Sequence, residues 1–293
     1  MTSLGHTSSS RGAHASSLKA EPQGKEGRRV ADGSVVMRGN VALVTGGSRG
    51  VGRAIARAFL QAGSKVVICG RTLPDELPHA QGPDGDECSA TFVEADLRNA
   101  DEAVHVVAET VEAHGRLDVL VNNAGGSPAS DAATSSPKFI EKIVALNLLA
   151  PFYCSQAANT VMQHQEEGGL IINIGSVSAL RPSPGTAAYG AAKAGLVSLT
   201  ESLAVEWAPK VRVNCISAGL LDSGAGPDHY GGPEGMARVA STVPLGRMGT
   251  PEDVAGLVLA MVGPFAPYLS GANVVLHGGG EWPAFLRSQG TPT

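Results

Sequence analysis

The sequence predicts an α/β fold, a doubly wound parallel sheet in three layers that forms a single domain. Short apolar runs typical of buried strands alternate with helical segments along the chain, and no change of composition marks a second domain. The expected strands are residues 41–45, 65–69, 90–95, 117–121, 170–175, 211–216 and 272–276. The expected helices are residues 53–62, 100–114, a helix from 137 onward, 187–207 and 251–262.

A glycine-rich turn follows the first expected strand and leads into the first helix. Such a turn lets backbone N–H groups approach a pyrophosphate at the helix N-terminus. Many α/β proteins use glycine turns for packing alone, but the strand–turn–helix order here indicates a dinucleotide site. Its expected contacts are Gly46, Ser48, Arg49, Gly50, Val51 and Gly52.

The residues after the second strand indicate which dinucleotide is bound. An acidic residue there would hold the ribose 2′-hydroxyl of NAD, but Gly70 occupies this position. Arg71 beside it and Arg49 in the glycine turn suit a 2′-phosphate, although either arginine could be a solvated surface charge. The sequence therefore favours NADP(H) and leaves NAD(H) open.

The stretch from Ser176 to Lys193 suggests the chemistry. Tyr189 and Lys193 are four positions apart on an expected helix, so their side chains share one face. A neighbouring ammonium favours the phenolate, and Ser176 at a strand end can hold the same substrate oxygen. Because a Tyr-x-x-x-Lys pair is also a common surface accident, the interpretation depends on the dinucleotide site.

Other features bound the class of protein. The formal net charge of −5 argues against a nucleic-acid surface, and four scattered cysteines without ligand spacing indicate reduced thiols of a cytoplasmic protein and no metal site. The apolar stretch 254–269 is interrupted by glycine and proline and is too short to span a membrane.

Residues 1–38 show no hydrophobic periodicity and are expected to form a disordered N-terminal extension. The catalytic domain is expected at 39–283, with a substrate lid at about 220–245 and a C-terminal tail at 284–293.

From about residue 37 to 280 the chain resembles the short-chain dehydrogenase/reductase family. The motifs that carry the resemblance are Thr45-Gly46-x-x-x-Gly50-x-Gly52, Asn122-Asn123-Ala124-Gly125, Asn147, Ser176 and Tyr189-x-x-x-Lys193. The resemblance implies a Rossmann-type sheet and a catalytic tetrad. In this tetrad Tyr189 would be the general acid or base, and Lys193 would lower the tyrosine pKa and bind the nicotinamide ribose. Ser176 would orient the substrate oxygen, and Asn147 would hold a water molecule in the proton relay.

The resemblance also implies further cofactor contacts and an assembly. Asp96 and Leu97 would lie near the adenine, and Asn123, Ala124 and Gly125 along the cofactor. Gly219, Leu221 and Ser223 follow the sixth strand, where Ser223 replaces the usual threonine beside the nicotinamide carboxamide. His277 stands where the family often has an acid. A homotetramer or dimer is implied.

The expected function is an NADP(H)-dependent oxidoreductase that interconverts a ketone and a secondary alcohol. A polyketide, a steroid or an acyl-thioester ketone would be the small-molecule substrate. The alternative is a dinucleotide-binding sensor or scaffold without turnover, which would be expected to have lost a member of the tetrad, and none is missing.

Overall fold

The computed structural model describes residues 29–31, 34–222 and 231–282, and its core is a parallel sheet of seven strands. The strand order is β11-β10-β9-β8-β3-β4-β7, which confirms the predicted fold class. The strands are β3 (Val41–Thr45), β4 (Lys65–Gly70), β7 (Thr91–Glu94), β8 (Val119–Asn122), β9 (Gly169–Ser176), β10 (Val211–Ala218) and β11 (Asn273–Leu276).

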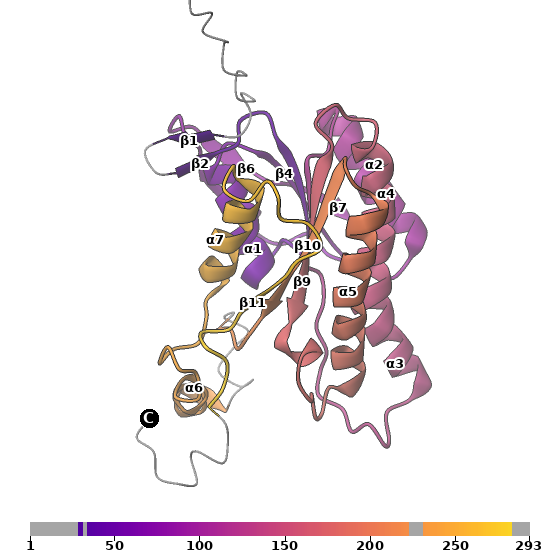
Figure 1. Cartoon of the computed structure of the whole chain (residues 1–293), viewed down its shortest axis with the longest axis vertical. Coiled ribbons are helices and arrows are strands. Elements are labelled where there is room, and N and C mark those ends of the chain that lie inside the picture. Colours follow the sequence, from indigo (N-terminus) through magenta and orange to yellow (C-terminus); the bar gives the residue numbers. More distant parts are fainter. Residues whose placement is uncertain (1–28, 32–33, 223–230, 283–293) are drawn as a thin grey trace, which may run out of the picture.

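Helices cover both faces of this sheet and complete the three layers (Figure 1). One face is covered by α1 (Gly50–Gln61) and α7 (Pro251–Val262). The other is covered by α2 (Ala100–His114), α4 (Ala150–Met162) and α5 (Ala187–Glu206). Each helix buries an apolar stripe against the strands, as Phe59 on α1 and Met162 on α4 illustrate.

The order of the strands determines where a ligand can bind. From β3 the chain first adds β4 and β7 on one side, and then returns to add β8, β9, β10 and β11 on the other. The topology therefore reverses between β3 and β8. In open α/β sheets, ligands bind outside the carboxyl ends of the strands at this switch point, where Thr45 and Asn122 end their strands.

A buried polar network fixes the strands beside this point. Asn122 donates from Nδ2 to Asn173 Oδ1 on β9 (2.8 Å), and Asn173 donates to Thr200 Oγ1 on α5 (2.9 Å). Hydrogen bonds between buried side chains hold their elements in one register, so β8, β9 and α5 form a rigid support.

Two expectations for irregular segments need correction. The stretch between β4 and β7, for which the sequence predicted no strand or helix before residue 90, contains an antiparallel hairpin of β5 (His79–Gln81) and β6 (Glu87–Ser89), with Ala80 buried. The disordered extension, expected over residues 1–38, was predicted to reach too far along the chain. A second hairpin pairs β1 (Arg29–Ala31) with β2 (Ser34–Val36), and Met37 is fully buried. Residues 1–28 lie outside the described residues.

The helix expected from residue 137 consists of three parts. They are α3 (Pro137–Val144), a π-helical turn η1 (Ala145–Leu149) and α4. In the expected lid, α6 (Gly232–Ala240) is described, whereas residues 223–230 and the C-terminal residues 283–293 lie outside the described parts of the chain. Within those parts, no helix combines the length and the apolar composition needed to cross a membrane.

Candidate active site

The glycine turn and the loop after β8 are joined at the switch point. Thr45 Oγ1 accepts hydrogen bonds from the backbone N–H groups of Asn123 (3.0 Å) and Ala124 (2.9 Å). In return, Asn123 Nδ2 donates to the carbonyl oxygens of Thr45 (2.9 Å) and Gly46 (3.2 Å). The sequence analysis assigned no separate role to Thr45. The signal for one was present, because Thr45 is a single hydroxyl residue at the end of an apolar strand.

The turn leaves no room for larger residues. A Cβ atom on Gly46 would lie 3.0 Å from the Cα of Ala124, and one on Gly52 would lie 2.3 Å from the carbonyl oxygen of Gly46. Gly46 and Gly50 also have φ angles of 64° and 52°, in the left-handed region that favours glycine. These glycines allow the backbone to fold tightly enough to present its N–H groups at one point.

The N-terminus of α1 differs from those of the capped helices. Asn99, Ser136 and Thr250 cap α2, α3 and α7 with their side chains, whereas the N-cap residue of α1, Arg49, makes no such bond. The first turn of α1 also contains no acidic residue. Its N–H groups therefore lack a side-chain acceptor, as a site for a phosphate anion requires.

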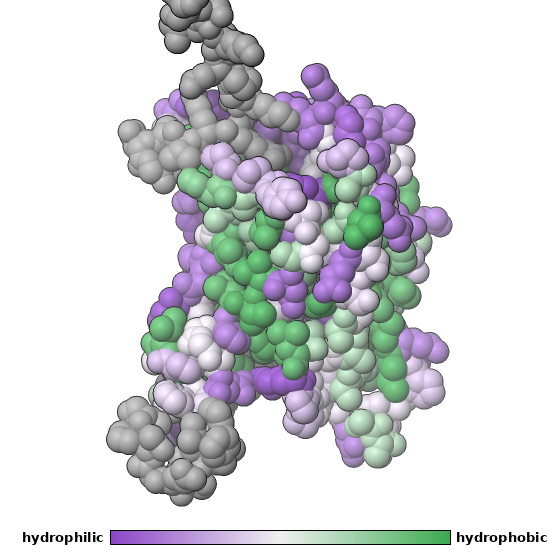
Figure 2. Space-filling view, viewed as in Figure 1, coloured by the Kyte–Doolittle hydropathy of each residue, from purple (hydrophilic) through white to green (hydrophobic). Residues whose placement is uncertain are grey.

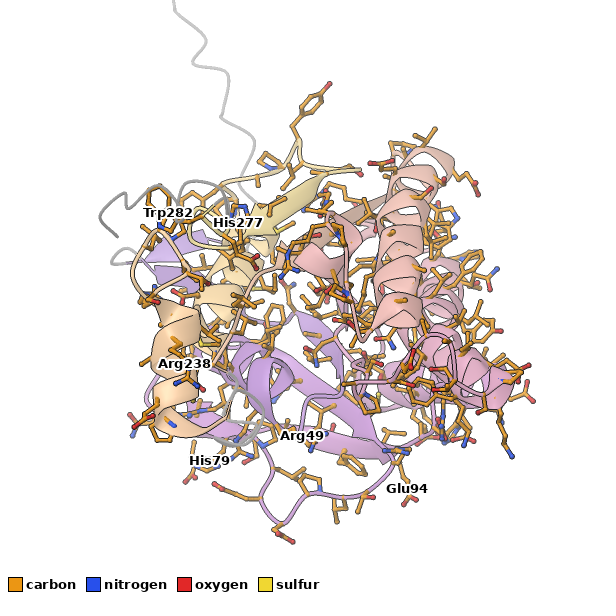
Figure 3. All side chains as sticks on the ribbon, turned by 90° about the horizontal axis from the view of Figure 1, so that it is seen from below. Arg49, His79, Glu94, Arg238, His277 and Trp282 are labelled. Carbon is orange, nitrogen blue, oxygen red and sulfur yellow. The ribbon has the colours of Figure 1, made fainter. Side chains whose placement is uncertain are left out.

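The residues expected at the adenosine end lie at the neighbouring strand ends. β4 pairs with β7 so that Gly70 is the register partner of Glu94, and Arg49 and Arg71 are exposed. Figure 3 shows Arg49 on the same side of the molecule as Glu94. The hydrogen-bonded guanidinium of Arg98 holds the pKa of Asp96 below its ordinary value, and the charge of Arg71 contributes less. Arg71 and Asp96 are therefore neighbours, and Leu97 beside them is buried.

Ser176, Tyr189 and Lys193 come together at the carboxyl end of β9. Ser176 is the last residue of this strand, and its hydroxyl lies close enough to Tyr189 to influence the pKa of that phenol. Lys193 is buried and donates from Nζ to the carbonyl oxygen of Ile174 (2.8 Å), and its Nζ lies 5.7 Å from the ring centre of Tyr189. A phenol and a hydroxyl that lie this close together can both reach a single substrate oxygen.

The ionisation of this group differs from the expectation. The resemblance implied that Lys193 lowers the pKa of Tyr189, but burial raises the pKa of this phenol and the nearby hydroxyl of Ser176 lowers it only in part. Burial also lowers the pKa of Lys193 from 10.5 to about 8, with a smaller opposing effect of Cys215. Both shifts have the same cause, because a low-dielectric interior disfavours the charged form of either group.

Asn147 lies on the π-helical turn η1 and is fully buried. Its Oδ1 accepts from the N–H of Gly126 (2.8 Å), and its Nδ2 donates to the carbonyl oxygens of Gly126 (3.0 Å) and Ile143 (2.9 Å). Such π-helical turns within α-helices are frequently found at functional sites. This one ties the loop after β8 to the helix that faces the candidate site.

Gly125 lies between Asn147 and Lys193. A Cβ atom on Gly125 would be 2.7 Å from Asn147 Oδ1 and 3.3 Å from Lys193 Nζ. All four tetrad residues are therefore grouped at the carboxyl ends of β8 and β9. Within the described residues, no group of histidine, cysteine, aspartate and glutamate side chains could hold a metal ion.

A cavity of about 270 Å³ opens next to this group. It is lined by Val177, which directly follows Ser176, by Gly219 and Leu220 after β10, and by the segment after β11. Gly219 donates its N–H to Leu276 O (2.8 Å), and Leu221 forms an isolated bridge with Gly249. Ser223, the third residue expected here, lies outside the described residues.

Comparisons with known proteins agree with this geometry. The sequence model of a family described as enoyl-(acyl carrier protein) reductase matches residues 46–281. The probable 2,4-dienoyl-CoA reductase of Bacillus subtilis is 34% identical over 252 residues, which cover 84% of this chain and 98% of that protein. The L-rhamnose 1-dehydrogenase (NAD(P)(+)) of Azotobacter vinelandii is 37% identical, over 81% of this chain and 94% of that protein.

A solved structure extends the likeness to three dimensions. The ligand-free aldohexose dehydrogenase of Thermoplasma acidophilum superposes with a TM-score of 0.74 at 28% identity, over 83% of this chain and 94% of that chain. Sequence and fold agree over most of the chain. The protein belongs to the short-chain dehydrogenase/reductase family and is an NAD(P)-dependent oxidoreductase.

Proposed function

We propose that this enzyme uses NADP(H) to interconvert a ketone and a secondary alcohol, with Tyr189 as the general acid and base. The observation that carries the proposal is the meeting of Ser176, Tyr189 and Lys193 at the end of β9, beside a cavity. The glycine turn stands at the switch point of the same sheet edge.

The residues present fit a dinucleotide. The uncapped N-terminus of α1 suits a pyrophosphate, with Gly46, Ser48, Arg49, Gly50, Val51 and Gly52 around it. Further along, Asn123, Ala124 and Gly125 would line the cofactor, and Gly125 has no side chain to fill the space between Asn147 and Lys193. We place Gly219, Leu221 and Ser223 at the nicotinamide end, as the family pattern implies. The nicotinamide, when bound, supplies the hydride in reduction and takes it up in oxidation.

The side chains of this protein would handle the proton. Since burial raises the pKa of Tyr189, the phenol is protonated at neutral pH and can donate to a ketone oxygen. Ser176 would hold that oxygen through a second hydrogen bond. Lys193 braces β9 through the Ile174 carbonyl, and Asn147 fixes the loop at Gly126. We assign to Asn147 the water of the proton relay.

Preference for NADP(H) is supported by the residues at the end of β4. Gly70 offers no carboxylate to a ribose hydroxyl, and Arg71 and Arg49 are exposed and form no ion pair with another described residue. Two unpaired guanidinium groups suit a 2′-phosphate. A relative whose name includes NAD(P)(+) is compatible with either cofactor.

Calorimetric titration with NADPH and, separately, NADH tests this part. We expect tighter binding of NADPH, and we expect Arg71→Ala to weaken NADPH binding without affecting NADH. Arg57→Ala, which removes an exposed arginine further along α1, is the matched control. Equal or tighter binding of NADH would overturn the cofactor assignment, and failure to bind either dinucleotide would overturn the whole proposal.

The substrate and the assembly are also proposed. A polyketide, steroid or acyl-thioester ketone remains the expected substrate class. A homotetramer or dimer is supported by the apolar band that Figure 2 shows over α7 and β11, where Val275 is 39% exposed. A monomer mass by light scattering would contradict this assembly. The free thiols Cys69, Cys88, Cys154 and Cys215 support a cytoplasmic location.

The alternative, a dinucleotide sensor without turnover, has less support. Every residue of the tetrad is present, and the hydroxyl of Ser176 lies next to Tyr189. Turnover of any carbonyl compound would exclude the alternative.

A further inference from the structure

We infer that the ion pair between Arg181 and Glu281 makes this enzyme select neutral substrates with an apolar body. This inference rests on the proposed function, because it assigns a substrate class to the same site. Three observations carry it: the place of the cavity, the composition of its wall, and the charge balance at its mouth.

The cavity adjoins the reacting groups. Val177 directly follows Ser176, and Gly219 follows Ala218, which is the register partner of Ser176 in the pairing of β9 with β10. A substrate whose oxygen contacts Ser176 and Tyr189 therefore extends its remaining atoms into this cavity.

The wall next to Ser176 is aliphatic. Val177, Leu180, Leu220 and Val243 line the cavity, and glycines add backbone only. A polyol placed against these side chains would lose its hydrogen bonds to water without gaining others. An aliphatic or alicyclic body would instead be stabilised by the burial of apolar surface.

The polar side chains of the lining are those of Arg181, His277 and Glu281. Arg181 Nη2 donates to Glu281 Oε1 at 2.6 Å, and the two side chains are 40% and 39% exposed, so the pair lies where the cavity meets solvent. Figure 3 shows His277 on the segment after β11, well apart from Arg49 at the adenosine end.

The charges of Arg181 and Glu281 neutralise each other, and a charged substrate would have to disrupt this ion pair in order to bind. A carboxylate entering the cavity would be repelled by Glu281 and would have to displace it from Arg181. The guanidinium is further held by Nη1, which donates to the carbonyl oxygen of Pro182 (3.3 Å). Like charges placed together at a recognition site discriminate strongly against the wrong partner. A neutral ketone is not repelled by Glu281 and does not have to displace it from Arg181.

The test compares two ketones of one skeleton, 4-ethylcyclohexanone and 4-oxocyclohexanecarboxylate, with saturating NADPH and with saturating NADH. For the wild type we expect kcat/KM for the anionic ketone to be lower by about tenfold or more. Glu281→Gln removes the repulsion and frees Arg181, so the ratio between the two kcat/KM values should fall to about one or reverse.

Two further variants show whether a change in selectivity comes from the charges of the pair or from a folding defect. Arg181→Gln leaves Glu281 unpaired and should discriminate against the anion more strongly than the wild type. The double variant Arg181→Glu with Glu281→Arg restores the pair and should restore the preference for the neutral ketone. Glu167→Gln, which breaks the ion pair with Arg116 elsewhere on the surface, is the matched control and should change neither value.

The outcomes separate the two proposals. If the wild type reduces both ketones equally well, or if Glu281→Gln and Arg181→Gln leave their ratio unchanged, the inference about selectivity is overturned and the proposed function stands. If the wild type reduces neither ketone with either dinucleotide, the selectivity inference is overturned, because a neutral ketone with an apolar body is then not accepted; the proposed function fails with it only if neither dinucleotide binds in the calorimetric titration.

Discussion

Lys193 donates its hydrogen bond to the carbonyl oxygen of Ile174, 2.8 Å away, while its Nζ lies 5.7 Å from the ring centre of Tyr189. The lysine therefore fixes the end of β9, two residues before Ser176, and its ammonium group also lies near the ring of Tyr189. Since burial raises the pKa of Tyr189 and lowers that of Lys193 to about 8, both groups favour their neutral forms.

The first prediction concerns the pH dependence of stability. The pKa of Lys193 falls from 10.5 in the unfolded chain to about 8 in the folded one. Between these values the unfolded chain binds a proton that the folded chain has released, so the free energy of unfolding rises with pH. From pH 7.5 to 10.5 we expect the wild type to gain on the order of 3 kcal/mol relative to Lys193→Met.

Urea unfolding at a series of pH values measures this difference. The exposed Lys142 on α3 supplies the control, since Lys142→Met should keep the pH dependence of the wild type. If the free energies of unfolding of the wild type and Lys193→Met differed by the same amount at every pH in this range, Lys193 would not be buried as described.

The glycine turn gives a second prediction. Gly52→Ala would place a Cβ atom 2.3 Å from the carbonyl oxygen of Gly46 and 2.5 Å from Asn123 Nδ2. Both atoms belong to the network that joins the turn to the loop after β8, so we expect a loss of about 1–3 kcal/mol in stability. Calorimetry should show NADPH affinity reduced by about tenfold or more, because the N–H groups of the turn are displaced.

Gly256→Ala is the matched control for this experiment. Gly256 is exposed on α7, and a Cβ atom there would meet nothing within 4 Å. Alanine favours the helix by about 1 kcal/mol, so this variant should gain stability and keep its affinity for the cofactor. If the two variants bind NADPH equally well, the turn does not hold the dinucleotide.

Elements with strong local signals were predictable from the sequence. Helices α2 and α7 begin and end at the expected residues, because Asn99 and Thr250 cap their N-termini and Gly115 and Gly263 follow their last residues. The parallel order followed from the alternation of strands with helices. The hairpin of β5 and β6 has strands of only three residues each, too short to show a period.

The site was only partly predictable, since its decisive contacts join distant residues. The π-turn at Asn147 depends on bonds to Gly126, 21 positions earlier. The pair of Arg181 and Glu281 joins residues 100 positions apart. The direction of the pKa shift of Tyr189 depends on its burial, which spacing along a helix does not reveal.

A third prediction concerns the start of α7. Asp253 accepts from the N–H of Thr250 (2.8 Å) and pairs with Arg247 (2.6 Å), which holds its pKa well below the ordinary value. An aspartate whose pKa is depressed in the folded state stabilises the protein above about pH 4, and the benefit is lost as the pH falls. Asp253→Asn should therefore cost about 1–2 kcal/mol at pH 7.

Urea unfolding at pH 7, 4 and 3 measures this contribution to the free energy of unfolding. The difference between the wild type and Asp253→Asn should shrink at each step toward acid. A difference that stays constant would mean that the capping carboxylate contributes through its shape and not its charge. Glu252→Gln, one residue earlier in the same turn, is the control.

The last prediction concerns Tyr189→Phe, which removes only the phenol oxygen. The ring still packs against Lys193, so the fold and NADPH affinity should be retained. The substrate oxygen would lose its proton donor, and we expect kcat to fall by about 10²–10⁴. Tyr153→Phe on α4 is the matched control, since Tyr153 is partly buried against the core cluster on this face of the sheet and is not among the residues that line the cavity.

The pH profile of the wild type distinguishes this role from a structural one. Because the pKa of Tyr189 lies above its ordinary value of 10.0, reduction should be insensitive to pH around neutrality and should decline only in strong alkali. Oxidation needs the phenolate, so the rate of oxidation should rise as the pH increases from neutrality into the alkaline range. Tyr189→Phe should abolish this opposition between the two directions. If the variant kept the turnover and the pH profiles of the wild type, another group would have to supply the proton, and the assignment of Tyr189 would be wrong.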